Sequence, residues 1–148
     1  MQVRDIMTSD VVCCSPGASL VTVARMMVEN DCGEIPVCDE NGKPVGVITD
    51  RDIVCRLVAK EKNPLALEAQ DCMSDPVVTA TPEMSVEDCA RLMEQYQVRR
   101  LPVVDEHGVF CAMIAQADLA TKASRDTTME VVSKVSEPNV FASSVGGR

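Results

Sequence analysis

Residues 46–52 read Gly-Val-Ile-Thr-Asp-Arg-Asp, a short apolar run that passes directly into a polar one. The apolar part is rich in β-branched residues and predicts a strand, while residues 50–60 predict an amphipathic helix. Thr49 therefore stands where a strand ends and a helix begins. The pattern returns in weaker form 66 positions later, where Asp118 takes the place of Asp52. This junction and its repetition determine the fold that we predict.

An internal repeat with a constant offset extends over most of the chain. It holds without a gap from Asp5 to Asp52. Identical pairs separated by 66 positions include Met7 and Met73, Pro16 and Pro82, Ser19 and Ser85, Pro36 and Pro102, Gly42 and Gly108, and Asp52 and Asp118. A single offset sustained over this length indicates a tandem duplication. We therefore expect two similar units related by a pseudo-two-fold axis.

Each copy is predicted to contain a strand, a helix, two strands and a second helix, which places the chain in the α/β (α+β) class. In the first copy we expect strands at 11–14, 35–38 and 45–48, a hairpin turn at 39–42, and a helix capped by Ser19 with Leu20, Val23, Ala24 and Met27 on one face. In the second copy we expect strands at 77–79, 101–104 and 113–114, a turn at 105–108, and a helix capped by Ser85. In the first turn, Asn41-Gly42 is predicted to supply the positive φ angles of a hairpin.

The predicted boundaries follow from the repeat and from local composition. They are a first repeat at 3–60, a second repeat at 69–124, a C-terminal helix at 125–137 and a flexible tail at 138–148. The tail contains too few apolar residues to order itself, which is why we expect it to be flexible.

The composition is that of a folded protein with an almost non-aromatic core. Of the 148 residues, 46% are hydrophobic, 2% are aromatic and none is Trp. So few aromatic residues leave no base-stacking platform, and a net charge of −9 repels both a nucleic-acid backbone and an anionic membrane surface. The sequence contains no signal-peptide pattern and no apolar run of about 18 residues. We expect a cytoplasmic protein with no nucleic-acid partner and no membrane partner.

The eight cysteines and the single histidine offer little support for catalysis. The cysteines show no C-x-x-C spacing, and most of them lie within apolar runs, which favours reduced core residues. One alternative stays open, because Cys14 and Cys38 lie on neighbouring predicted strands and could form a redox or metal site. His107 lies in a predicted turn, away from any nucleophile. We expect no catalytic residues, no bound metal and no enzymatic activity.

The junction at Thr49 has the chemistry of a nucleotide site. The Thr49 hydroxyl and the free amides of the following helical turn favour an anion such as a phosphate. Asp52 offers a carboxylate that can accept from the two hydroxyls of a ribose. Gly46 permits the close approach of a ligand or a neighbouring strand. However, Thr-x-x-Asp is also a plain helix cap worth about 1 kcal/mol, so the motif alone leaves the structural and the binding interpretation open.

The repeat and the order of its parts resemble the CBS domain pair, a regulatory module. The resemblance rests on Asp5-Ile6-Met7-Thr8, Pro36-Val37-Cys38-Asp39 and residues 49–53, and it extends from residue 3 to about residue 120. Residues 97–102, which read Gln-Val-Arg-Arg-Leu-Pro, and the short chain are similar to bacterial stand-alone members of the hypoxic response protein type.

In this family, ligands lie in clefts between the two copies, and the resemblance implies the composition of each cleft. The residues assigned to the first cleft are Ile48, Thr49, Arg51, Asp52, Val77, Val78, Val98, Arg99 and Arg100. The valines would enclose an adenine ring. Arg100, together with Arg51, would bind the phosphate that Thr49 holds, because charge-assisted hydrogen bonds are stronger than neutral ones.

The second cleft is predicted to be degraded. The residues assigned to it are Val12, Cys32, Gly33, Ala115 and Asp118. Ala115 lacks the hydroxyl of Thr49, and Glu34 stands at the position of Arg100. A carboxylate that faces a phosphate is repulsive. We therefore expect one functional site and one degraded site in each chain.

These residues together predict a regulatory module that binds AMP, ADP, ATP or a related adenosyl ligand and requires no cofactor. Exposed helix faces favour a homodimer, and ligand binding would shift a conformational equilibrium that an unknown effector protein reads. The sequence does not separate a nucleotide from S-adenosylmethionine or a dinucleotide. Two alternatives remain: a redox- or metal-responsive module that uses the cysteines, and a structural dimer with a vestigial cleft.

Overall fold

The computed structural model describes residues 1–123 and 132–136, and the chain forms two compact units. The first-copy unit is Val12–Val77. The second-copy unit joins Met1–Val11 to the described part of Val78–Arg148. The units are therefore not simply the two sequence repeats, because the N-terminal segment of each copy belongs to the unit formed by the other copy.

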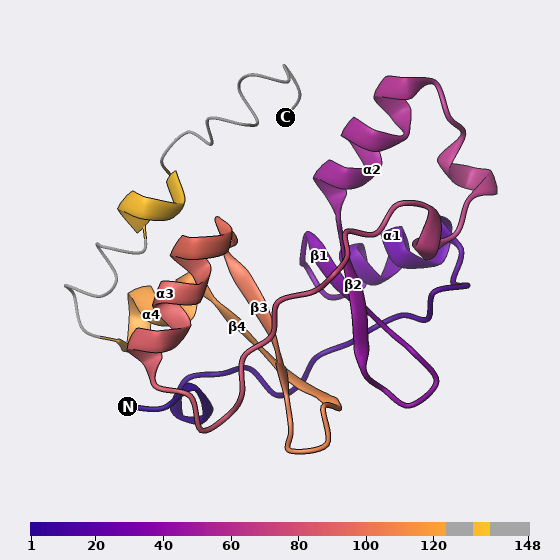
Figure 1. The fold of residues 1–148 in the computed structure, drawn as a ribbon. Helices are drawn as coiled ribbons and strands as arrows, with labels where there is room; N and C mark the ends of the chain where they lie inside the picture. Colours follow the sequence, from indigo (N-terminus) through magenta and orange to yellow (C-terminus); the bar gives the residue numbers. More distant parts are fainter. Residues whose placement is uncertain (124–131, 137–148) are drawn as a thin grey trace. The chain divides into compact units, whose positions relative to one another are not determined.

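The first-copy unit is built around an antiparallel hairpin (Figure 1). Its elements are α1 (Leu20–Glu29), β1 (Glu34–Cys38), β2 (Pro44–Thr49) and α2 (Asp50–Arg56). Ser19 caps α1 as predicted, since its hydroxyl accepts from the Thr22 amide at 3.2 Å. Strand β2 continues directly into α2 at Thr49. The predicted helix face is correct for Leu20, Val23 and Met27, which are buried, but wrong for Ala24, which is exposed.

The second-copy unit repeats these elements. It contains α3 (Val86–Tyr96), β3 (Arg100–Val104), β4 (Phe110–Ala115) and α4 (Gln116–Lys122). The two hairpins have the same register, since Glu34 pairs with Thr49 in one and Arg100 pairs with Ala115 in the other. Each hairpin also has an irregularity at the same place, before its turn. This correspondence confirms the tandem α+β architecture predicted from the sequence.

The strand predicted at the start of each copy is much shorter than expected. The run at 11–14 contributes a single parallel bridge between Cys14 and Val37, and the run at 77–79 is followed by one between Ala80 and Val103. Both runs are divided between the two units, at Val11 and Val12 in one case and at Val77 and Val78 in the other. Because neighbouring residues belong to different units, neither run can pair along its length in one sheet.

Two further predictions for the first copy are corrected. The helix expected at 50–60 ends at Arg56, and a 3₁₀ turn, Val58–Lys60, follows after Leu57, which is buried in the core. The chain bends at Leu57. The Leu57 carbonyl, which has no partner within the helix, accepts hydrogen bonds from the amides of Lys60 and Lys62. In the hairpin turn only Gly42 has a positive φ, of 77°, because Asp39 Oδ1 accepts from the Asn41 and Lys43 amides and organises the turn itself.

Each unit has its own apolar core, completed by the exchanged segment. In the second-copy unit Val3 and Ile6 are buried, and Thr8 pairs with Met113. In the first-copy unit, Ala69 and Cys72 are buried and Ser74 pairs with Val47 in the equivalent way. The exchange is therefore reciprocal, and each core depends on residues from both sequence repeats.

Part of the predicted C-terminal helix is described. Residues 132–136 are helical, Val135 is buried in the second-copy core, and the Gln97 side chain donates to the Lys134 carbonyl at 2.8 Å. The rest of the predicted helix at 125–137, and the tail at 138–148, lie outside the described residues. Within the described part of the chain, no helix is long and apolar enough to cross a membrane.

Candidate ligand-binding site

The junction between β2 and α2 is a closed capping box. Thr49 Oγ1 accepts from the Asp52 amide at 3.0 Å, and Asp52 Oδ2 accepts from the Thr49 amide at 3.0 Å. The Thr49 backbone is extended while Asp52 is already in the first helical turn, which is the geometry that a Thr-x-x-Asp sequence favours. The structural interpretation of the motif is therefore correct. The hydroxyl proton of Thr49 and Asp52 Oδ1 are not used by the box.

Arg56 holds the remaining oxygen of Asp52. The Arg56 Nε atom lies 3.6 Å from Asp52 Oδ1, and the Asp52 side chain is only 15% exposed. Arg56 Nη1 also approaches the carbonyls of Cys72 and Met73, at 3.3 and 3.4 Å. Arg56 is not among the site residues predicted from the sequence, although its position four residues after Asp52 on a helix is a signal for such a contact. The aspartate is thus oriented from both sides before any ligand arrives.

Two glycines near the junction are in close contact with neighbouring protein atoms. A Cβ atom on Gly46 would lie 2.7 Å from Met73 Sδ and 3.0 Å from the Ser74 carbonyl oxygen. Of the two roles proposed for Gly46, the close approach of a neighbouring segment is therefore the one found. A Cβ atom on Gly33 would lie 3.0 Å from Asp50 Oδ2, and the Gly33 carbonyl accepts from the Asp50 amide at 3.0 Å. The turn before β1 thus lies directly beside the start of α2.

The other first-cleft residues of this unit differ in accessibility. Arg51 is exposed, and Val77 is half-buried. Ile48 is completely buried in the first-copy core, so it exposes no surface to a ligand in this structure. Across the hairpin, Glu34 is the register partner of Thr49. Residues directly opposite in an antiparallel pair share a face, so a carboxylate lies on the same face as the Thr49 hydroxyl. The resemblance to the family implies Glu34 only in the second cleft.

The second-copy unit carries the remaining predicted contacts. Val78 and Val98 are half-buried and pack against the core, so only part of each side chain could contact an adenine. Arg99 and Arg100 are exposed at the start of β3, and the Arg99 carbonyl accepts from the Gln116 amide at 2.8 Å. The residues predicted for the first cleft are therefore divided between the two units. Their convergence into one pocket stays a prediction.

The corresponding junction of the second copy is an incomplete box. Asp118 Oδ2 accepts from the Ala115 amide at 2.8 Å, but Ala115 has no side-chain oxygen for the Asp118 amide. Of the other residues assigned to the second cleft, Val12 and Cys32 are half-buried and pack against the first-copy core, and Gly33 lies beside Asp50. The second junction therefore lacks the hydrogen bond that the Thr49 hydroxyl makes in the first.

All eight cysteines are free thiols, and the buried ones are poorly suited to chemistry. Burial raises the pKa of Cys14 to about 11. The pKa of Cys38 is raised to about 12, mainly by burial and to a smaller extent by a hydrogen bond with Cys13. Thiols that stay protonated are weak nucleophiles and weak metal ligands. Among the residues that the structure describes, no group of three or more His, Cys, Asp or Glu side chains is placed to hold a metal ion.

Two α-β-β-α units, each with a β–α junction at which an aspartate accepts from the backbone, define the fold of a tandem-repeat module. The family model of the CBS domain matches this chain twice, at residues 3–59 and 69–125. The chain belongs to the CBS domain family, as a tandem pair.

Proteins with similar sequences include members of nearly the same length. Hypoxic response protein 1 of Mycobacterium tuberculosis is 31% identical over 140 residues, which cover 95% of this chain and 97% of that protein. The CBS domain-containing protein YhcV of Bacillus subtilis is 34% identical over 139 residues, which cover 93% and 97%. An uncharacterised protein of Methanopyrus kandleri is 34% identical over 119 residues, and the chain spans only 61% of its length.

Solved structures with the same fold include CBS proteins in several states. Hypoxic response protein I, crystallised with two coordinated zinc ions, has a TM-score of 0.75 at 31% identity, covering 82% of this chain and 98% of that one. The CBS domain pair of protein MJ0100, in complex with 5′-methylthioadenosine and S-adenosyl-L-methionine, has a TM-score of 0.73 at 26% identity, covering 81% and 97%. A hexameric CBS-CP12 protein from bloom-forming cyanobacteria has a TM-score of 0.74 at 27% identity, covering 98% and 79%.

Proposed function

We propose that this protein is a regulatory module that binds an adenine nucleotide or a related adenosyl ligand at the Thr49 junction and has no catalytic activity. The observation that carries the proposal is the contrast between the two β–α junctions, of which only the first has a hydroxyl and a carboxylate fixed together. The adenosyl ligands of a structurally similar CBS pair support the choice of ligand class.

In the proposed complex, Asp52 accepts hydrogen bonds from the ribose and Thr49 donates its hydroxyl proton to the ligand. Asp52 suits this task because its carboxylate is already oriented by the Thr49 amide and by Arg56, so little side-chain entropy is lost on binding. Arg51, Arg99 and Arg100 are exposed cations, and we assign them to the phosphates, with Val77, Val78 and Val98 around the adenine.

The number of phosphates in the ligand determines how strongly binding depends on the arginines that we assign to them. ATP carries the most negative charge of the four compounds compared below, so its binding depends most on Arg51, Arg99 and Arg100. A comparison of 5′-methylthioadenosine, S-adenosylmethionine, AMP and ATP therefore resolves the ligand class.

The test is calorimetric titration of the full chain with these four ligands. Thr49→Ala should weaken binding at least tenfold, while Thr49→Ser, which keeps both the hydroxyl and the cap, should bind nearly as the original. Arg100→Glu should weaken the binding of AMP and ATP but leave the affinity for 5′-methylthioadenosine unchanged. This variant therefore tests the contribution of the second copy separately from that of Thr49. Equal affinity of Thr49→Ala and the original protein for every ligand would sink the proposal.

We further propose that the module works as a cytoplasmic homodimer whose conformation an effector protein reads. Ligand binding can shift such an equilibrium only by its difference in affinity for the two states. The sequence suggested Cys14 as the partner of Cys38 in the redox alternative, whereas the hydrogen bond of Cys38 with Cys13 favours Cys13 as that partner. The redox alternative predicts a Cys13–Cys38 disulfide after mild oxidation, so recovery of eight titratable thiols from an oxidised sample would remove it.

A further inference from the structure

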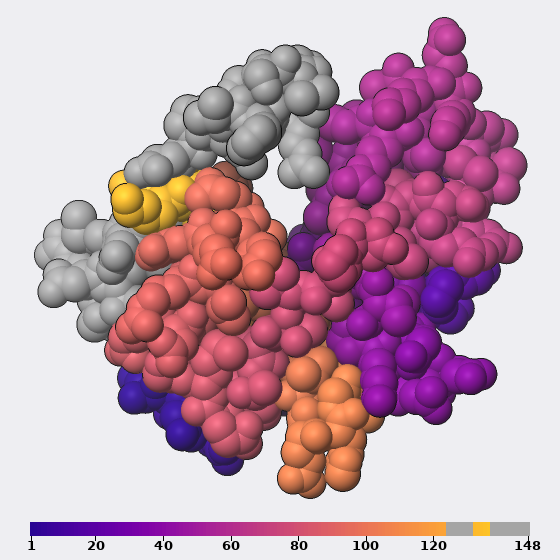
Figure 2. Space-filling view, in the orientation of Figure 1, coloured from indigo at the N-terminus to yellow at the C-terminus, as the bar shows by residue number. Residues whose placement is uncertain are grey.

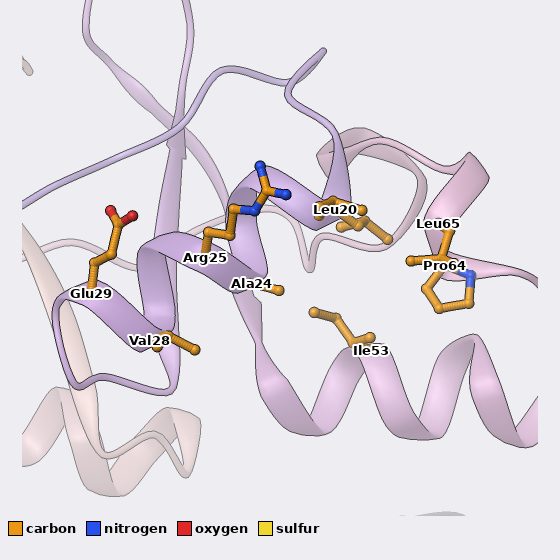
Figure 3. A pocket seen from close by; sticks show the side chains of 9 residues that line it. Leu20, Ala24, Arg25, Val28, Glu29, Ile53, Pro64 and Leu65 are labelled. Carbon is orange, nitrogen blue, oxygen red and sulfur yellow. The ribbon is translucent and has the colours of Figure 1, made fainter.

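Helix α2 carries polar contacts that are separate from its packing on α1. None of its residues is buried, and Figure 2 shows the helix, in magenta at the upper right, at the surface of the first-copy unit. Ile53 points toward α1 across an apolar groove (Figure 3), whereas Asp52 and Arg56 contact each other one helical turn apart. Arg56 is not among the residues that line the groove, so it can be substituted without disturbing the packing of α2 on α1.

The Arg56 guanidinium is shared between the ligand site and a second segment of the chain. Its Nε atom lies 3.6 Å from Asp52 Oδ1, and its Nη1 atom lies 3.3 and 3.4 Å from the carbonyl oxygens of Cys72 and Met73. An N–H···O hydrogen bond is ordinarily about 2.9 Å long, so each of these three contacts can still shorten. One guanidinium is therefore divided among three oxygens, and a change at Asp52 alters how closely it approaches the two carbonyls.

The segment that Arg56 contacts is the exchanged segment of the second repeat. It comprises residues 69–74, whose apolar side chains help to complete the first-copy core. Its last residue, Ser74, exchanges hydrogen bonds with Val47 of β2. The chain leaves this unit soon afterwards, at Val77. Residues 69–74 therefore anchor the chain to the first-copy unit immediately before it passes into the second-copy unit.

The second copy has the contact with the exchanged segment but not the contact with the aspartate. Lys122 corresponds to Arg56 at the offset of 66 positions. Its Nζ atom donates to the Ile6 carbonyl at 3.3 Å, and Ile6 corresponds to Cys72 at the same offset. No ion pair joins Lys122 to Asp118, both of which the structure describes. Holding the exchanged segment is therefore common to both copies, whereas joining it to the aspartate is particular to Arg56.

We propose that Arg56 couples ligand binding at the Thr49 junction to the anchoring of residues 69–74. When the ribose hydroxyls donate to Asp52 Oδ1, they take the place of the guanidinium there, and the guanidinium moves closer to the two carbonyls. The ligand thereby tightens the exchanged segment. The coupling is reciprocal, so a firmly held segment raises the affinity for the ligand. This inference rests on the proposed function and adds the route by which ligand binding acts on the rest of the chain.

The first experiment is hydrogen exchange of the full reduced chain, without ligand and with AMP or 5′-methylthioadenosine at equal occupancy. The amides of Cys72, Met73 and Ser74 donate to carbonyls within the segment or on β2, so their exchange reports how firmly the segment is held. Bound ligand should slow these amides about fivefold more than the amides of β1, which belong to the same unit and correct for general stabilisation by the ligand.

The variant that tests the coupling is Arg56→Lys, which introduces the residue of the second copy. A single ammonium keeps one donor for the exchanged segment but cannot contact the aspartate and the carbonyls together, as the planar guanidinium does. The extra slowing of residues 72–74 should therefore disappear. Arg25→Lys, at an exposed position of α1 labelled in Figure 3, makes the same chemical change and should keep the extra slowing. Circular dichroism would verify that both variants are folded.

The second experiment changes the ligand and not the protein, so it does not depend on the folding of a variant. 2′,3′-Dideoxy-AMP has no ribose hydroxyl to donate to Asp52, and once bound it should slow residues 72–74 no more than β1. Extra slowing that persists with this compound or in Arg56→Lys would overturn the coupling while leaving the proposed function in place. So would the absence of extra slowing when AMP binds to the original protein. An original protein that binds neither AMP nor 5′-methylthioadenosine would overturn both.

Discussion

At the scale of single residues, the two β–α junctions are an internal comparison within one chain. Thr49 and Asp52 exchange two hydrogen bonds, whereas Asp118 receives one from Ala115 and the Asp118 amide has no side-chain acceptor there. The Thr49 hydroxyl therefore contributes to stability whether or not a ligand binds. Any loss of binding in Thr49→Ala has to be separated from a loss of helix capping, which is why Thr49→Ser is needed.

Completing the second box should stabilise the protein. In Ala115→Thr, the new hydroxyl can accept from the Asp118 amide as Thr49 does for Asp52, so the free energy of unfolding should rise by about 1 kcal/mol. Urea denaturation measures the change. Ala117→Thr, at an exposed position of α4 where no cap can form, should give no gain. A gain in both variants, or in neither, would contradict the capping argument.

The sequence predicted the residues of the first junction but not their surroundings. Thr49 at the end of a strand and Asp52 in the first helical turn followed from local pattern alone. The contact between Arg56 and the Cys72 and Met73 carbonyls joins residues 16 and 17 positions apart, and Glu34 reaches Thr49 only through hairpin register. Such contacts depend on how segments pair, which propensity and periodicity do not encode.

At the scale of elements, β2 is held on both sides. It pairs with β1 along its length, and Val47 also exchanges hydrogen bonds with Ser74, at 3.1 and 2.9 Å. Gly46, which is buried, lies against Met73 and Ser74 in that second contact. Its lack of a side chain is what allows the segment after the linker to approach β2 closely.

Gly46→Ala should therefore destabilise the first-copy unit. The new methyl would meet the Ser74 carbonyl at 3.0 Å, and because that atom is backbone it can move only by shifting the paired segment. We expect a loss of about 2 kcal/mol, in the range of overpacked cores. Gly17→Ala is the control, because a Cβ atom there would meet nothing within 4 Å. Chemical denaturation monitored by circular dichroism would show a clear difference between the two variants, and equal stability would refute the explanation.

The errors in predicting elements have one main source. Helices α1 and α3 and both hairpins were predicted because their signals are local: a capping serine, an apolar face and alternating strands around a glycine turn. The runs at 11–14 and 77–79 have the composition of strands but are cut by the passage from one unit to the other. No local signal marks such a passage, since both sides of it are equally apolar.

At the scale of the whole molecule, the cores depend on the exchanged N-terminal segments. Ile6 is buried in the second-copy core although it lies more than 70 residues before that copy's first helix. Ile6→Ala should lower the free energy of unfolding by about 3 kcal/mol, as for other buried truncations. Val54→Ala, at an exposed position of α2, should be nearly neutral. Hydrogen exchange should show the loss in β3 and β4 more than in β1 and β2, and a uniform loss would contradict the division into units.

The stability of the molecule should also fall in alkaline solution. Burial raises the pKa of Cys14 from 9.0 to about 11, and that of Cys89 to about 12. Their unfolded forms ionise near pH 9 while the folded forms stay protonated, so the folded state binds more protons and loses stability as the pH rises from about 9 toward 12. Urea denaturation at pH 8, 9 and 10 should show this decline. Cys89→Ala should make it shallower, and an unchanged slope would count against this origin.

The exchange of N-terminal segments bears on the history of the chain. A lone repeat cut from it, residues 1–60 for example, would lack Ala69 and Cys72 and would carry Val3 and Ile6 with nothing to cover them. Two such fragments could complete their cores only by exchanging their N-terminal segments. Gene duplication turns this exchange between two molecules into an exchange within one polypeptide. After the duplication, deleting either half leaves the core of the other half incomplete.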